Sequence, residues 1–282
     1  MKTLKSNLTI IVVSFKSRKK IIKIVSKIKN KINIMIVDNS NDKLIKKKLY
    51  KYKNISFVFP KNNNGFGCAL NYAIKRTKTK YILYLDLDTK INYTQIKKIY
   101  KKTLQVKNFG VITAKIKNQN YNDLILGYDP INKMKYVKFN TGCVMMFNRK
   151  TFLKLGGFDE NFFLYYEESD FYRRCIKLKK KIYLFEDIII QHEGKGSIDR
   201  AYKEKYDILR NWHYCWSKFN YYNKHHSYLT ACSKTFPNFV KAIKGMIAGI
   251  IKFNFYKFKL HFAEISGLIA AYLRFRSYYR LY

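Results

Sequence analysis

Two aspartates, one residue apart, follow directly on a short apolar run. The run extends from Tyr81 to Leu85, and Asp86-Leu87-Asp88 comes next. An apolar run of this length predicts a buried strand, along which residues two apart point to the same side. Both carboxylates would then share a face at the carboxyl end of a strand, where open α/β sheets bind ligands. Paired oxygen ligands suit a hard divalent cation that holds a diphosphate. Alternatively, one aspartate caps the following helix and the other faces solvent.

A second group of acidic residues lies in an aromatic stretch, from Phe158 to Asp170, in a chain with only 18 acidic residues. Apolar neighbours raise the pKa of a carboxyl group, and such tuning suits a general base. Glu167 and Glu168 are the candidates for that role. The alternative is an ordinary helix start, in which these two side chains complement the helix dipole and Asp170 pairs with an arginine one turn later.

Three further features could serve a nucleotide or its diphosphate, and each has a simpler alternative. Asp38 ends a predicted strand, where a carboxylate can contact a ribose or base, or can act as a helix cap or turn residue. Gly65 and Gly67 allow close backbone approach before a helix whose N-terminus can bind phosphate. The sequence contains neither GxGxxG nor GxxxxGK, so it has no dinucleotide fingerprint and no P-loop. His192 follows a predicted strand in a glycine-rich loop and could be a metal ligand or a phosphate donor, although a lone histidine is more often structural.

The apolar pattern predicts the scaffold that positions these residues. Strand-like runs alternate with helical stretches, such as the one in which Ile21, Ile22, Val25 and Ile28 recur at helical spacing. This alternation predicts an α/β fold with a mostly parallel sheet flanked by helices. The strands are expected at residues 8–14, 32–37, 55–59, 81–85, 110–116 and 181–190.

The composition is that of a globular protein, with 282 residues of which 48% are hydrophobic. The five cysteines form no CxxC, which argues against a zinc site or a disulfide framework and fits a reducing compartment. The N-terminus lacks the continuous apolar core of a signal peptide, and no stretch is long and apolar enough to span a bilayer. We therefore expect a cytoplasmic protein, or one held peripherally on the cytosolic face of the inner membrane.

The net charge of +39 is extreme. AT-rich coding bias alone would enrich lysine, but a surface this basic attracts polyanions whatever its origin, either nucleic acid or anionic lipid. The sequence contains no RNA- or DNA-binding motif, so we expect no specific nucleic-acid partner.

Apolar and basic residues alternate at helical spacing near the C-terminus. Basic amphipathic helices rich in aromatic residues suit an interface with anionic lipid. Alternatively, the apolar stripes pack on the preceding domain or on a second subunit of a homodimer. The two stripes are Phe239, Ile243, Met246, Ile247 and Ile250, followed by Ile265, Leu268, Ile269 and Tyr272.

Taken together, these stretches resemble the family 2 glycosyltransferases with a GT-A fold, especially the rhamnosyltransferase-like subgroup. The order and spacing of the matching stretches are more specific than any single one. They are Ile11-Val12-Val13-Ser14-Phe15, Val37-Asp38-Asn39-Ser40, Asn63-Asn64-Gly65-Phe66-Gly67, Leu85-Asp86-Leu87-Asp88, Gly156-Gly157-Phe158-Asp159-Glu160, Phe163-Leu164-Tyr165-Tyr166-Glu167-Glu168-Ser169-Asp170, and His192.

The resemblance implies that a sugar passes, with inversion, from a nucleotide-sugar donor to a hydroxyl of a glycan or lipid-linked acceptor in surface polysaccharide or oligosaccharide synthesis. A divalent cation, Mg²⁺ or Mn²⁺, would bridge the donor diphosphate at Asp88, with Asp86 and His192 beside it. The subgroup often has Asn-Pro-Asp where this chain has Asp86-Leu87-Asp88, and the last aspartate is kept. Glu168 aligns with the family's base, with Glu167 as the alternative, because the family usually has Glu-Asp at this pair.

The resemblance covers roughly residues 8–197 and implies a GT-A catalytic domain, which we expect over residues 1–220. From the apolar and basic stripes we expect residues 221–282 to form a basic amphipathic helical extension, which associates with a membrane in one of the two interpretations given above. The alternative function is a basic nucleic-acid- or membrane-binding scaffold without catalysis, which would have no need of grouped acidic residues. The resemblance assigns contacts with the nucleotide sugar to five residues, Ser14, Asp38, Asn64, Gly65 and Asp86. It assigns acceptor-side positions to Asp159 and Asp170.

Overall fold

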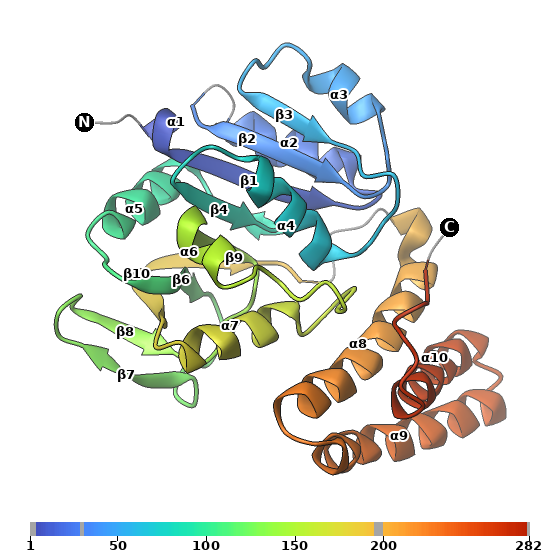
Figure 1. Cartoon of the computed structure of the whole chain (residues 1–282). Helices are drawn as coiled ribbons and strands as arrows, with labels where there is room; N and C mark the ends of the chain where they lie inside the picture. Colours follow the sequence, from blue (N-terminus) through green and yellow to red (C-terminus); the bar gives the residue numbers. More distant parts are fainter. Residues whose placement is uncertain (1–3, 29–30, 195–199, 281–282) are drawn as a thin grey trace. The chain divides into compact units, whose positions relative to one another are not determined.

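The computed structural model describes residues 4–28, 31–194 and 200–280, and Figure 1 labels its helices and strands. The chain forms two compact units. The division predicted after residue 220 falls inside helix α8 (Lys203–His225), which runs through it without a break. Where the functional domains divide stays a prediction. The sheet unit comprises Met1–Asn64, Cys68–Phe158 and Phe171–Ile198, and the helical unit comprises Gly65–Gly67, Asp159–Asp170 and Asp199–Tyr282.

The sheet unit is built on one mixed sheet, with the strand order β3-β2-β1-β4-β9-β6-β10-β8-β7 and β5 paired to β10. The first four strands in this order run parallel, as do β6 and β10. The predicted α/β fold is confirmed. The sheet is more mixed than the sequence predicted, because β9 runs antiparallel between β4 and β6 and an apolar run does not encode its own direction. The strands are β1 (Leu8–Ser14), β2 (Asn33–Asp38), β3 (Ile55–Val58), β4 (Tyr81–Leu85), β5 (Thr89–Lys90), β6 (Phe109–Ile116), β7 (Ile125–Asp129), β8 (Met134–Val137), β9 (Val144–Asn148) and β10 (Lys181–His192).

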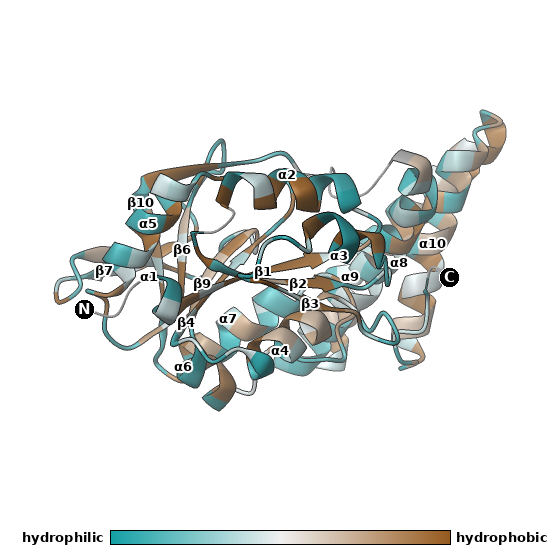
Figure 2. Cartoon of the chain, turned by 90° about the horizontal axis from the view of Figure 1, so that it is seen from above, coloured by the Kyte–Doolittle hydropathy of each residue, from teal (hydrophilic) through white to brown (hydrophobic). Residues whose placement is uncertain are grey.

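Helices cover both faces of this sheet. Figure 2 shows α2 and α5 on one face and α4 and α6 on the other. The apolar side of α2 is buried, including Ile21, Ile24 and Ile28, because its isoleucines recur at helical spacing and meet the β-branched residues of the strands. The helices are α1 (Leu4–Asn7), α2 (Arg18–Ile28), α3 (Leu44–Leu49), α4 (Phe66–Arg76), α5 (Tyr93–Thr103), α6 (Arg149–Lys154) and α7 (Glu167–Lys177), and a 3₁₀ turn, η1, covers Arg200–Tyr202.

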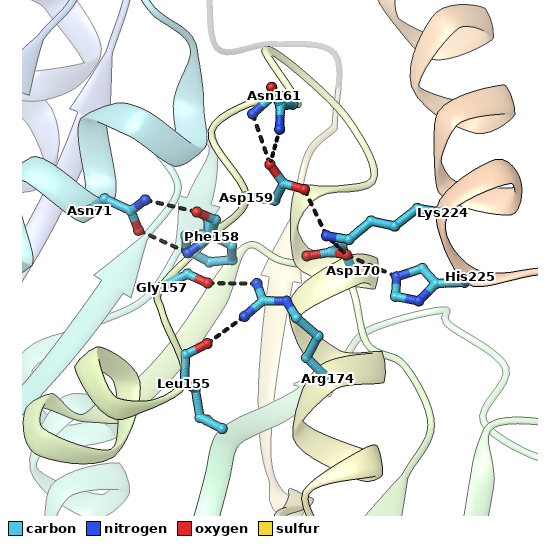
Figure 3. A network of polar contacts seen from close by, with 10 residues as sticks. All are labelled: Asn71, Leu155, Gly157, Phe158, Asp159, Asn161, Asp170, Arg174, Lys224 and His225. Carbon is cyan, nitrogen blue, oxygen red and sulfur yellow. Dashed lines mark hydrogen bonds and ion pairs between the residues drawn. The ribbon is translucent and has the colours of Figure 1, made fainter.

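A double hydrogen bond anchors the segment that follows α6. The side chain of Asn71 on α4 donates to the Phe158 carbonyl and accepts from the Phe158 amide, both at 2.9 Å (Figure 3). Gly157 has φ +66°, and a Cβ there would lie 2.5 Å from the Asn71 oxygen, so the position requires glycine. Arg174 of α7 donates to the carbonyls of Leu155 and Gly157, each at 2.6 Å.

The helical unit contains three long helices, α8, α9 (Tyr228–Ile251) and α10 (Phe255–Tyr272). Its core is aromatic, and the ring of Phe219 on α8 contacts the ring of Tyr272 on α10. Small residues let the helices approach closely, since a Cβ on Gly267 would lie 2.4 Å from the Trp212 carbonyl oxygen. None of the helices in the described ranges combines the length and apolar content that a membrane span needs.

The two apolar stripes predicted near the C-terminus have different surroundings. Leu268 is fully buried, and Tyr272 packs on Phe219 and Phe239, so the second stripe packs within the helical unit. Ile247 and Ile250 are 48% and 56% exposed, so part of the first stripe faces solvent.

Ion pairs tie the first turn of α7 and the segment before it to the end of α8 within the helical unit (Figure 3). Asp170 is fully buried, and its Oδ1 lies 2.5 Å from Lys224 Nζ and 2.8 Å from His225 Nε2. Lys224 also reaches Asp159 at 2.6 Å. The sequence offered an arginine one turn along the same helix as a partner for Asp170, and it did not indicate these two partners on α8.

We expect Asn71→Ala to lower the stability of the sheet unit by about 2 kcal/mol, because it removes both buried hydrogen bonds between this side chain and the Phe158 backbone. Asn122→Ala is the matched control, since Asn122 is exposed, and we expect a change within about 0.5 kcal/mol. The midpoint of urea unfolding measures both. Equal midpoints for the two variants would contradict the anchoring role of Asn71.

We expect Asp170→Asn to destabilise the helical unit by about 2 kcal/mol. Breaking a buried ion pair costs about 3–5 kcal/mol, and the cost is smaller here because the Lys224 side chain is 36% exposed. Asp123→Asn makes the same change in charge at an exposed position and serves as the control. Thermal unfolding of the two variants gives the comparison, and a melting temperature as high for Asp170→Asn as for Asp123→Asn would contradict the ion-pair role.

Candidate functional site

Asp86, Asp88 and His192 come together at the carboxyl end of β4, in the sheet unit. One potential ligand atom from each residue lies within 4.8 Å of the other two. The Nε2 atom of His192 is 2.8 Å from Asp88 Oδ1 and 3.7 Å from Asp86 Oδ2. The structure therefore brings together the three residues that the resemblance assigned to the metal.

Main-chain hydrogen bonds bring His192 to this place from a distant part of the sequence. Strand β5 begins directly after Asp88 and pairs antiparallel with the end of β10, so that Thr89 lies opposite His192. The sequence placed His192 in a loop after the strand, and this was wrong, because pairing with β5 extends the strand through His192. Residues 195–199 of the predicted loop lie outside the described residues.

The charges in this cluster partly offset one another. The side chains of Asp88 and His192 are 3% and 19% exposed, whereas that of Asp86 is 32% exposed. The neighbouring carboxylates of Asp86 and Asp88 raise the pKa of His192 to about 10, so the ring carries a proton at neutral pH. Burial alone would raise the pKa of Asp88, but the contact with His192 and the charge of Lys20 outweigh it and lower that pKa.

This set of donors fits a divalent cation. Carboxylate oxygens suit Mg²⁺, and carboxylates with an imidazole nitrogen suit Mn²⁺ and similar ions. Within the described ranges, Asp88 Oδ1 and His192 Nε2 are buried and have no hydrogen-bond partner of suitable geometry, although they lie close to each other. Buried polar atoms rarely stay unpaired, so both are available to a bound ion. Binding would require the imidazole to lose its proton.

A small cavity with lysines on one side adjoins Asp88. Its volume is about 50 Å³, and Glu193 and Lys90, which form an exposed ion pair at 3.0 Å, also line it. Ligand pockets usually measure about 300–1,000 Å³, so a nucleotide sugar would lie mostly outside this cavity. The lysines, all on α2, are Lys20, Lys23 and Lys27.

Ser14 and Asp38 end the adjacent parallel strands β1 and β2, opposite each other in the register. Asp38 is fully buried. Its carboxylate accepts hydrogen bonds from the hydroxyls of Ser14 and Ser40 and from the Asp42 amide. These contacts fix the turn after β2, as expected if Asp38 acts as a turn residue. Its contact with a nucleoside stays a prediction.

Gly65 has φ +97°, and a Cβ there would lie 2.2 Å from the carbonyl oxygen of Phe163. The next amide, of Phe66, donates to that same oxygen at 3.0 Å. The close backbone approach expected at Gly65 is therefore observed, and the group approached is the Phe163 carbonyl of the same chain. Asn64, just before it, is exposed. The contacts of both residues with a donor stay predictions.

Glu167 and Glu168 begin α7, directly after two residues in a backbone conformation that bulky side chains rarely adopt. Tyr165 and Tyr166 have φ +68° and +67°, and such strain concentrates at functional sites. Helix α8 holds this turn in place: Arg210 donates to the Tyr165 hydroxyl.

Further contacts from α8 support the same turn. The rings of Tyr214 and Tyr221 lie 5.9 and 5.3 Å from that of Tyr166. The Ser217 hydroxyl donates to the Leu164 carbonyl at 2.9 Å. The two glutamates therefore follow a turn that is fixed by one face of a long helix.

The environment of these glutamates favours the protonated form. Burial and then the charge of Glu168 raise the pKa of Glu167 well above its ordinary value, and burial also raises the pKa of Glu168. Within the described part of the chain, neither carboxylate forms an ion pair, and Glu167 Oε2 is buried without a hydrogen-bond partner. Glu168 is the more accessible of the two. A carboxylate in such surroundings can take a proton from a substrate hydroxyl.

The sequence analysis did not find the ion-pair partners of Asp159 and Asp170. Lys224 bridges Asp159 and Asp170, and His225 contacts Asp170. Lys224 offsets the effect of burial on Asp159 and lowers its pKa. The adjacent Lys224-His225 pair was the only signal in the sequence. It was hidden because lysine is frequent throughout the chain. An acceptor-side role for Asp159 and Asp170 stays a prediction.

Known proteins resemble this chain in sequence and in fold. The chain is 25% identical over 194 residues to the low-salt glycan biosynthesis hexosyltransferase Agl10 of Haloferax volcanii, which covers 61% of this chain. The match spans 62% of that relative's length.

Two solved structures resemble the whole fold. The mannosyltransferase PcManGT from Pyrobaculum calidifontis, in complex with GDP-Man and Mn²⁺, has a TM-score of 0.60 and 14% identity, over 95% of this chain and 87% of that one. TarS 1–349 from S. aureus, in complex with UDP-GlcNAc, has a TM-score of 0.54 and 12% identity, over 97% of this chain and 93% of that one. This likeness confirms the GT-A fold.

The family model named Glycosyl transferase family 2 matches residues 9–184, more than half of the chain. This range begins in β1 and contains Asp38, Asp86, Asp88, Glu167 and Glu168. Because this model matches more than half of the chain, the chain belongs to glycosyl transferase family 2.

Proposed function

We propose that this protein transfers a hexose from a nucleotide-sugar donor to a hydroxyl of a glycan or lipid-linked acceptor, with inversion at the anomeric carbon. The observation that carries the proposal is the meeting of Asp86, Asp88 and His192 at the carboxyl end of β4 in a family 2 chain. The Haloferax relative is a hexosyltransferase of glycan biosynthesis, and the PcManGT structure holds a nucleotide sugar with Mn²⁺. Surface polysaccharide or oligosaccharide synthesis is the process we infer.

Asp88, Asp86 and His192 would hold the divalent cation, Mg²⁺ or Mn²⁺, in this proposal. When bound, such an ion acts as a Lewis acid that stabilises the leaving nucleoside diphosphate. The buried Asp88 supplies a fixed negative charge, and Asp86, being partly exposed, lies on the solvent side of the cluster. Lys20, which lines the adjoining cavity and lowers the pKa of Asp88, adds positive charge near the place where the diphosphate would bind.

Glu168 is the general base we propose, with Glu167 as its alternative. The carboxylate removes the proton of the acceptor hydroxyl while that oxygen forms the new bond to the anomeric carbon. The bond from this carbon to the diphosphate oxygen breaks in the same step, and the electron pair leaves with the nucleoside diphosphate. A single displacement puts acceptor and leaving group on opposite faces of the sugar, so the configuration inverts. No covalent intermediate is needed.

The remaining assignments are finer parts of the same proposal. Ser14, Asp38, Asn64 and Gly65 would contact the nucleotide sugar. The order of the sequence motifs supports membership of the rhamnosyltransferase-like subgroup within the family. We place the reaction on the cytosolic face of the inner membrane, where a lipid-linked acceptor would be accessible.

We expect the protein to release nucleoside diphosphate from one member of a panel of UDP-, dTDP- and GDP-sugars when Mg²⁺ or Mn²⁺ is present. EDTA should abolish release, and Asp88→Asn should reduce it by about 10²-fold or more, equal to about 2.7 kcal/mol of activation free energy. Asp123→Asn, an exposed aspartate in the same unit, should release diphosphate at the wild-type rate. Undiminished turnover in EDTA, or an active Asp88→Asn, would exclude the proposed metal site.

We expect Glu168→Gln to lower kcat by about 10²–10⁴-fold, because the amide cannot accept the proton. Donor binding, measured by calorimetry, should stay unchanged. The base acts in its deprotonated form, and its pKa is raised, so wild-type activity should fall with decreasing pH at a higher pH than an ordinary glutamate would give. Glu167→Gln is the comparison. If it removes activity while Glu168→Gln does not, the base is Glu167, and if neither does, the mechanism is wrong.

A further inference from the structure

Large apolar side chains are gathered at the turn between α9 and α10. We give the name hairpin tip to five of these side chains, each of which is at least about half exposed. Figure 2 colours this end of the C-terminal helices brown, the hydrophobic end of its scale. The exposed fractions are 48% for Ile247, 56% for Ile250, 71% for Ile251, 84% for Phe253 and 72% for Phe255.

The packing of the two helices does not require these side chains. Small residues occupy the interface, including Ala242 and Gly249 on α9 and Ala263 on α10, and all three are buried. A Cβ on Gly249 would lie 2.9 Å from the Phe258 amide nitrogen, so the helices meet at the tip through backbone contact. The hairpin therefore closes without its largest side chains, which remain on the outside.

The stretch of sequence on either side of the tip carries charge of one sign. From Tyr228 to Ala263 the sequence contains six lysines and no aspartate or glutamate. Lys244, Lys252 and Lys257 flank the tip and are exposed. Their long side chains can hold the ammonium group at the level of lipid headgroups while their carbon chains cover apolar surface.

Two acidic residues of α8 reach the same end of the helical unit. Glu204 pairs with Lys259 at 3.0 Å, and Asp207 accepts a hydrogen bond from the Tyr256 hydroxyl at 2.9 Å. These contacts hold the start of α10 against α8. They offset one lysine and leave the three that flank the tip.

We propose that the hairpin tip inserts into the interface of an anionic lipid bilayer. An exposed apolar turn flanked by lysines has both features that shallow membrane binding needs, buried apolar area and attraction to anionic headgroups. A second copy of this chain is a poorer partner, because a symmetric contact would bring two sets of lysines together. The inference is independent of the proposed reaction, since vesicle binding needs neither donor nor metal.

The test is sedimentation of the full-length protein with vesicles of phosphatidylcholine, with and without phosphatidylglycerol. The tip variant combines Phe253→Asn with Phe255→Ser, and asparagine is chosen because Phe253 has φ +49°. The matched control combines Tyr50→Ser with Ile131→Ser, two apolar residues that are 78% and 85% exposed in the sheet unit. We expect about a tenfold or greater loss of binding for the tip variant and no loss for the control.

A second pair of variants separates insertion from general attraction, which a net charge of +39 would produce anywhere on the surface. Lys252→Gln with Lys257→Gln should weaken binding to phosphatidylglycerol vesicles more than Lys46→Gln with Lys47→Gln, which removes the same charge from α3. Equal effects of the two pairs, or wild-type binding by the tip variant, would overturn the proposal. A wild-type dimer that the tip variant converts to a monomer, with unchanged vesicle binding, would assign the tip to self-association instead.

Discussion

A carboxylate taken out of water needs a compensating partner, and this constraint orders much of the structure. The chain has 57 lysines and arginines and 18 acidic residues, so cations are always at hand, yet the pairs that form inside the protein are specific. Asp88 lies beside His192. Asp129 is held by hydrogen bonds from Lys181 and Tyr183, which lower its pKa. Each pair joins segments that are far apart in the sequence, so the scarce acids also fix where distant elements meet.

Glu167 and Glu168 are the exceptions to this pattern. Burial raises both pKa values, and in the described ranges no lysine or arginine compensates them. The two residues before them, Tyr165 and Tyr166, have left-handed backbone conformations that α8 supports through side-chain contacts. Unpaired charge and backbone strain in one short segment both reduce stability, and neither is needed to close the core. Such a combination is expected where a carboxylate must exchange a proton with a substrate.

Local pattern was enough to predict part of this arrangement. The apolar run before Asp86 predicted β4, because such a run depends only on neighbouring residues. Asp86 and Asp88 do lie close together, but in a turn after the strand, so the period of two along a strand is not what brings them together. The end of β10 could not be predicted in the same way, since His192 is in a strand only through its pairing with β5. The direction of β9 depends likewise on its neighbours in the sheet. Lys224 was one lysine among many until the fold brought it to Asp170.

Short-range and long-range electrostatic interactions have different roles in this protein. Ion pairs such as Asp170 with Lys224 are formed within a few ångströms and fix local geometry. In the described ranges these ion pairs use a minority of the basic side chains, and most of the lysines are exposed. The summed field of the exposed lysines extends over about 10 Å at moderate ionic strength. A nucleotide sugar and an anionic membrane both carry phosphate, so this field would draw each of them in without distinguishing between them. Discrimination must then come from groups that act at contact. For the donor these are Asp88 and His192, and for the membrane they are the apolar side chains of the hairpin tip, because an apolar side chain gains free energy only where it leaves water.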